Sequence, residues 1–137
     1  MCSSDLPTIA TIKSTATNTP TAFQDSGGTE VGKLARAWVN YNAVEQVIRS
    51  SFNVSSVTWN SFASYTVNFT TAFPNNNYVP MVSGANGLDA TYRGTSIWII
   101  SGQDNYEPTA SSCTVNFEYR TGGGSQASRY VGFAAFS

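Results

Sequence analysis

The stretch RAWVNYNAVEQVIRSSFNVSSVTWNSFASYTVNFTTAFP, residues 36–74, alternates apolar side chains with hydroxyl and amide side chains and carries almost no charge. The segment SYTVNFT at 64–70 shows the pattern best, because Tyr65, Val67 and Phe69 share one face while Thr and Asn occupy the other. A period of two is that of a β-strand with one buried face. The stretch therefore predicts strands with an apolar inner face and an uncharged polar outer face.

Further strand-like segments are separated by turns rich in Gly, Asn and Pro. They cover residues 36–42, 46–54, 78–84, 96–102, 112–120 and 129–136. Short connections favour antiparallel pairing, and burying one face of each strand requires two packed sheets. We predict an all-β fold, an antiparallel, jelly-roll-like β-sandwich of seven or eight strands. Pro80 indicates an edge strand or a bulge, and Trp38 and Trp98 are expected to be buried.

The first 34 residues differ from the rest, because they are rich in Thr and Ser and their apolar residues are isolated. Such a segment is either a disordered linker or an extended arm that gains order only on another chain. We predict an arm over residues 1–34 and a sandwich domain over residues 35–137. The apolar arm residues expected to be buried between subunits are Ile9, Ile12, Phe23, Val31 and Leu34. Residues 1–6, MCSSDL, resemble a translated sequencing adapter, so we exclude them from fold reasoning and expect more chain upstream.

The charge balance disfavours several classes of partner. The formal net charge is -1 and only 11% of the residues are charged, so little electrostatic force is available to capture nucleic acid or an anionic membrane. No apolar run approaches the roughly 18 residues that span a bilayer, and the N-terminus lacks the pattern of a signal peptide. We expect no nucleic-acid partner, no membrane insertion and no conventional secretion.

Catalysis has little support in the sequence. The chain has no histidine, which removes the commonest general base and the commonest metal ligand. No two carboxylates are marked as an acid and base pair for glycoside hydrolysis; the candidates are Glu45, Asp89, Asp104, Glu107 and Glu118. We therefore expect no catalytic residue, and a carbohydrate-active enzyme is the disfavoured alternative.

Metal binding and modification are also weakly indicated. The loops at 87–91 and 102–107 contain carboxylates but lack a dense calcium-ligand spacing, so we interpret them as turns and expect neither a metal nor a cofactor. Cys2 and Cys113 are interpreted as unpaired. The two glycosylation sequons, at Asn53 and Asn68, are interpreted as strand residues that match by chance.

Aromatic residues make up 13% of the chain, and several lie beside predicted loops. Sugar rings stack on aromatic side chains, while Asn, Ser and Asp bind their hydroxyl groups. The candidate ligand-binding residues are Tyr92, Arg93, Asp104, Asn105 and Tyr106. For any one aromatic side chain, packing in the core or between subunits remains the alternative.

The segments LARAWVNYN, VIRSSFNVSSVT, YTVNFTTAFPNNNYV and VGFAAF together resemble a known family. It is the C-terminal domain of tail fibres and other virion proteins of marine and cyanobacterial tailed bacteriophages. The resemblance is detailed over residues 29–84 and looser up to the last strand. Tyr41 stands where the family has Phe, and AVEQV and TWNSFASY stand where it has other turns. These departures affect the expected binding specificity rather than the fold.

The resemblance implies a virion appendage, a small β-sandwich commonly assembled as a homotrimer on a fibre or knob. We therefore expect a structural protein of the phage particle, assembled in the bacterial cytoplasm and attached to other virion proteins. It would mediate attachment to a bacterial surface carbohydrate. The alternative is a capsid decoration or adaptor protein with no receptor-binding role.

Overall fold

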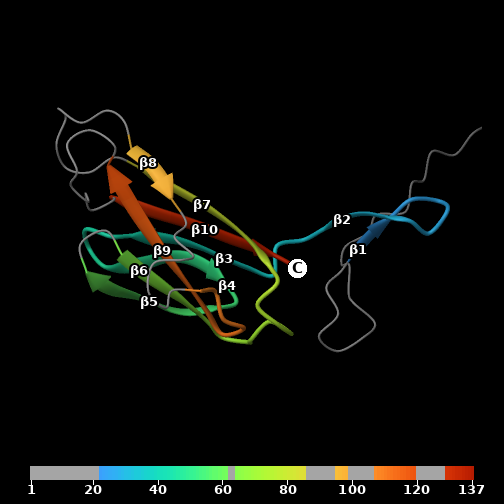
Figure 1. Ribbon diagram of the computed structural model, residues 1–137, viewed down its shortest axis with the longest axis horizontal. Helices are drawn as coiled ribbons and strands as arrows, with labels where there is room; N and C mark the ends of the chain where they lie inside the picture. The colour runs from blue at the N-terminus through green and yellow to red at the C-terminus, as the bar shows by residue number, and fades with distance from the viewer. Residues whose placement is uncertain (1–21, 62–63, 86–94, 99–106, 120–128) are drawn as a thin grey trace, which may run out of the picture. The chain divides into compact units, whose positions relative to one another are not determined.

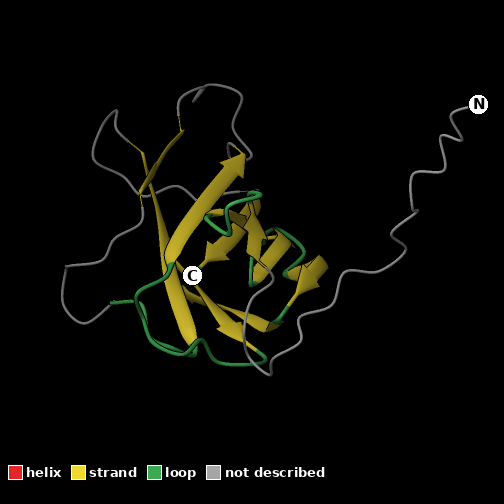
Figure 2. Ribbon diagram, turned by 90° about the vertical axis from the view of Figure 1, so that its right-hand side faces the viewer, coloured by secondary structure: helices red, strands yellow, loops and turns green. Residues whose placement is uncertain are grey.

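The computed structural model describes residues 22–61, 64–85, 95–98, 107–119 and 129–137. The chain divides into two compact units, Met1–Leu34 and Ala35–Ser137, which are taken one at a time below. The described residues form strands, turns and loops and contain no helix (Figure 2). The predicted all-β class is confirmed.

In the first unit, the described residues form a small hairpin of β1 (Ala22–Gln24) and β2 (Glu30–Lys33). The carboxylate of Asp25 closes the turn by accepting hydrogen bonds from the backbone N–H groups of Gly27 and Thr29, both at 2.9 Å. Gly28 has a φ of 83°, which glycine adopts without strain. The sequence predicted an extended arm here, and the local Asp-Ser-Gly-Gly turn explains the hairpin.

The second unit consists of two four-stranded antiparallel sheets that pack on each other as a β-sandwich. One sheet has the order β4-β3-β10-β7 and the other β5-β6-β9-β8. The strands of the first are β3 (Ala37–Asn42), β4 (Val47–Phe52), β7 (Val79–Ala85) and β10 (Tyr130–Phe136). Those of the second are β5 (Val54–Ser61), β6 (Ser64–Phe69), β8 (Thr95–Trp98) and β9 (Ser112–Tyr119).

In each sheet, the strand that comes last in the sequence lies between two strands that precede it. The last strand, β10, pairs with β3 on one side and β7 on the other, and β9 pairs with β6 and β8 in the same way (Figure 1). This nesting suits the predicted jelly-roll-like sandwich. Pro80 lies on β7, an edge strand of its sheet, as the sequence predicted.

The core lies between the two sheets and is rich in aromatic rings. Tyr41 of β3 contacts Tyr65 of β6 edge to face, with ring centroids 5.9 Å apart, and Tyr65 contacts Phe117 of β9 at the same distance. Phe69 of β6 reaches Phe133 of β10 with a centroid separation of 6.0 Å. The Tyr41–Tyr65 and Phe69–Phe133 contacts cross the sandwich, whereas Tyr65 and Phe117 are neighbours in one sheet.

Two predictions on the first half of the domain are wrong. Residues 58–65 were expected to hold a loop, but Val54–Ser61 forms the edge strand β5. Trp38 was expected to be buried, yet 38% of its surface is exposed. Strand β3 buries Ala37, Val39 and Tyr41, and the period of two then places Trp38 on the opposite face of the sheet.

Asn53 forms the corner at which the chain passes from one sheet to the other. It lies between β4 and β5 with a φ of 54°, in the left-handed region that Asn tolerates better than most residues. Its side-chain amide donates to the backbone oxygens of Arg36 at 3.1 Å and Thr71 at 3.0 Å, and its oxygen accepts from the Thr71 N–H at 2.7 Å. Asn53 is therefore a structural clamp and not the strand residue that the sequence suggested.

Candidate oligomer interface and ligand pocket

The outer face of the sheet β4-β3-β10-β7 carries an apolar row. The strand register places Phe52 opposite Trp38, Trp38 opposite Ala134, and Ala134 opposite Met81, so the row crosses all four strands. Phe52 is 55% exposed, Met81 is 60% exposed, and Val79 beside them is 64% exposed. Aromatic side chains each have roughly 150–250 Å² of surface, so the exposed apolar area here is several hundred Å². Patches of this size mark interaction surfaces.

A groove runs beside the row, because the central strand β10 presents small residues there. Gly132 and Ala134 lie between the taller side chains of β3 and β7. A cavity of about 390 Å³ opens at this place and is lined by Val39, Met81, Val82, Ser83, Gly132, Phe133, Ala134 and Phe136. A neighbouring hollow includes Arg49, whose guanidinium lies 4.5 Å from the ring centroid of Tyr130. The groove is therefore apolar at one end and polar at the other.

The outer face of the second sheet is different, because its polar side chains bond to one another. Asn68 donates to Ser56 at 3.0 Å and Thr58 at 3.1 Å, and Thr66 pairs with Thr114 at 2.9 Å. These residues lie on three adjacent strands in direct register. These side chains are uncharged and hydrogen-bonded to one another, so this part of the face can remain in water without a partner.

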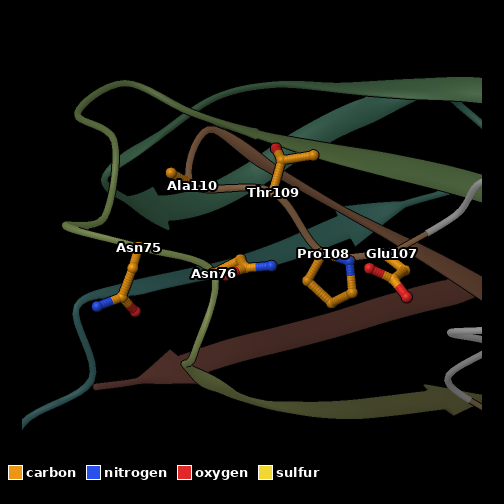
Figure 3. Close-up of a pocket in the computed structure, with 6 residues that line it drawn as sticks. All are labelled: Asn75, Asn76, Glu107, Pro108, Thr109 and Ala110. Carbon is orange, nitrogen blue, oxygen red and sulfur yellow. The ribbon is translucent and has the colours of Figure 1, made fainter.

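A second cavity, of about 580 Å³, lies at a rim of the sandwich (Figure 3). It is lined by Asn75, Asn76, Glu107, Pro108, Thr109 and Ala110. One wall comes from the segment between β6 and β7, and the other from the segment before β9. In Figure 3 the side chain of Asn76 extends toward Pro108 of the other segment.

Most predicted site residues cannot be placed. All five candidate ligand-binding residues, from Tyr92 to Tyr106, lie outside the described residues, as do Ile9 and Ile12 of the predicted interface. Phe23, Val31 and Leu34 are described and exposed within the first unit, so their burial between subunits stays a prediction. The sequence analysis missed Phe52, Met81 and the rim cavity. Two features of the sequence could have indicated the apolar row. Val79 and Met81 flank Pro80, and small residues alternate with apolar ones along residues 131–135.

The titratable groups of the core are shifted by burial. Desolvation raises the pKa of the Cys113 thiol to about 11, and a hydrogen bond with Tyr78 partly opposes this rise. The pKa of Tyr78 is raised above its ordinary value, mainly by burial and to a smaller extent by the neighbouring Cys113. Burial also raises the pKa of Tyr41 and Tyr65. Cys113 is a free, buried cysteine. All four groups lie in the core and outside the two cavities.

Two features are absent from the described residues. That part of the chain holds no cluster of three or more His, Cys, Asp or Glu side chains suited to a metal ion. It also contains no helix with the length and apolar character needed to cross a membrane. Comparison with known proteins gave no matching family model, curated protein or solved structure.

Proposed function

We propose that this chain is a non-enzymatic structural module of a bacteriophage virion, a homotrimeric tail-fibre or knob domain that serves in attachment to a bacterial surface carbohydrate. The observation that supports the assembly of copies in this proposal is the apolar row of Phe52, Trp38, Ala134 and Met81 on the outer face of one sheet. Its occupant is a second copy of the same chain.

Three features of the face favour a copy of the chain over another kind of partner. The row contains no charged residue, so two copies meet without electrostatic repulsion. Its bulky side chains are Phe52 on β4, Trp38 on β3 and Met81 on the other edge strand, β7. Its small residue, Ala134, lies on β10 between Trp38 and Met81. An edge of one copy can therefore enter the groove of the next, which is the head-to-tail contact that closes into a ring.

The area of the face is consistent with repeated contacts of this kind. A standard interface buries roughly 800 Å² on each partner. The apolar row supplies several hundred Å² as the centre of such an interface, and the polar end with Arg49 and Tyr130 supplies a rim. The number of subunits and the phage origin are supported only by the resemblance of residues 29–84 to virion proteins.

The test is the mass in solution of the full chain, measured by light scattering after size-exclusion chromatography. We expect three times the 14.7 kDa of one chain. Met81→Lys should give a monomer, because a charge on the β7 end of the buried row would be desolvated without a partner. Val44→Lys is the matched control, since Val44 is equally apolar and 53% exposed but lies in the turn after β3.

A third sample, residues 35–137, tests the first unit separately. If the arm interlocks the subunits, this sample should dissociate at a protein concentration at which the full chain remains trimeric. A monomeric full chain, or a trimer unaffected by Met81→Lys, would contradict the proposed interface.

A further inference from the structure

We infer that the rim cavity lined by Asn75, Asn76 and Glu107–Ala110 is a binding site for a neutral sugar. The inference rests on the proposed attachment function and assigns to it a site that the sequence analysis did not identify. The cavity is separate from the apolar row, since the two share no lining residue. Its volume of about 580 Å³ lies within the range of roughly 300–1,000 Å³ typical of small-molecule sites.

The first wall of the cavity is anchored at both ends. Asn75 and Asn76 lie between Phe73 and Tyr78, which are buried. The rings of Phe73 and Tyr78 are in contact, with centroids 4.6 Å apart, and both contact Phe69 of the core. The Asn75 side chain also accepts a hydrogen bond from the N–H of Asn77 at 2.9 Å. The segment is thus fixed without using the side chain of Asn76.

The second wall is bonded to the first and to itself. The N–H of Phe73 donates to the Ala110 oxygen at 2.7 Å, and the Tyr78 hydroxyl donates to the Thr109 oxygen at 3.1 Å. The Thr109 hydroxyl accepts from the N–H of Ser112 at 2.9 Å and closes a local turn. Two segments about 30 residues apart in sequence therefore hold a preformed cavity, which lowers the entropy cost of binding a ligand.

Two polar side chains at the cavity are not used by the fold. Neither Asn76 nor Glu107 forms a hydrogen bond or ion pair with another described residue. Together they offer two amide donors, an amide oxygen and a carboxylate. Pro108 and Ala110 add apolar surface between them.

This combination matches the chemistry of a pyranose ring. A carboxylate accepts hydrogen bonds from adjacent sugar hydroxyls, an amide both donates and accepts, and the C–H face of the ring packs on apolar surface. None of the described lining residues is cationic, which disfavours an anionic ligand. A calcium ion would need roughly six to eight oxygen ligands, and among the described lining residues Glu107 alone carries a carboxylate.

The test is nuclear magnetic resonance with defined sugars on the full chain. Glucose, galactose, mannose, rhamnose and N-acetylglucosamine are added singly, and both saturation transfer to the sugar and shifts of the protein amides are recorded. We expect at least one sugar to bind with an affinity on the order of millimolar and to shift the Asn76 side-chain amide and the Ala110 N–H. Asn76→Ala and Glu107→Gln should each weaken binding roughly tenfold. Glu30→Gln, an exposed change in the first unit, is the control and should bind normally.

Each other outcome overturns the inference. These outcomes are no binding by any of the five sugars, binding with shifts elsewhere only, or binding unaffected by both cavity variants. Shifts at the cavity caused by calcium chloride alone would assign it to a cation instead. All variants are exposed changes, and the mass of each sample is measured in parallel, so a trimer that binds no sugar would overturn this site while leaving the proposed assembly intact. That result would favour the decoration or adaptor role.

Discussion

Replacing Asn53 by alanine tests whether the corner between the two sheets depends on one side chain. Asn53→Ala removes three hydrogen bonds, two to the oxygens of Arg36 and Thr71 and one from the Thr71 N–H. Each contributes about 0.5–1.5 kcal/mol net. Alanine must also adopt the φ of 54°, which adds about 1 kcal/mol. Allowing for partial exposure, we expect the free energy of unfolding to fall by about 3 kcal/mol.

Asn53→Gly separates the two contributions. Glycine loses the same hydrogen bonds but adopts the left-handed conformation freely, so it should be about 1 kcal/mol more stable than the alanine variant. Asn76→Ala is the matched control, because Asn76 is exposed and forms no hydrogen bond with another described residue. It should change stability by less than about 0.5 kcal/mol.

The assay is urea unfolding followed by tryptophan fluorescence. All variants are made in the Met81→Lys background, because self-association would make the apparent stability depend on protein concentration. The reasoning is refuted if Asn53→Ala unfolds at the urea concentration of its parent. It is also refuted if the glycine variant is less stable than the alanine variant, since backbone strain would then have no part in the effect.

Three further predictions concern the core and the two outer faces. The Cys113 thiol has a pKa of about 11 in the folded chain and near 9.0 in the unfolded chain. The contribution of this group to stability should therefore be constant below pH 9 and fall by roughly 2–3 kcal/mol as pH rises to 11. Cys113→Ala should remove that part of a pH series of urea titrations. Thr66→Val and Thr114→Val should show a coupling of about 0.5–1 kcal/mol in a double-mutant cycle, and additive effects would mean that their 2.9 Å contact contributes nothing. Gly132→Ala would place a Cβ against the Ser83 Oγ, so the Ser83 side chain must rotate. The added methyl group then fills the groove, and self-association measured by light scattering should weaken about tenfold. The double variant Gly132→Ala, Ser83→Ala relieves the clash but keeps the methyl group, so it should not restore self-association.

The alternation of residues predicted the core where only one face of a strand is apolar. Tyr65, Val67 and Phe69 were assigned correctly because Thr and Asn lie between them. The same reasoning failed at Trp38, since both faces of β3 carry large side chains and period alone does not say which face is inside. The loop expected at residues 58–65 came instead from the turn that the resembling family has there. Val54–Ser61 forms an edge strand, and its Ser, Thr and Asn residues suit that place because an edge strand needs few apolar residues.

The candidate site was less predictable than the fold. In the sequence, Asn76 belongs only to an Asn-rich turn between predicted strands, and Glu107 was considered only as one of several unpaired acids. They line one cavity because β6 and β9 pair and bring their flanking segments together. That proximity depends on long-range pairing, which no local pattern in the sequence reports.

The central place of β10 in its sheet also governs the order in which the domain can be made. During synthesis β3, β4 and β7 leave the ribosome before residues 130–136. Until then β3 is paired on one edge only, with β4, and β7 lacks the strand with which it pairs in the sheet. Unpaired edges and an uncovered core favour aggregation. A pause in translation shortly before Tyr130 would prolong that open state, so the yield of folded protein should depend on how quickly the final strand is delivered.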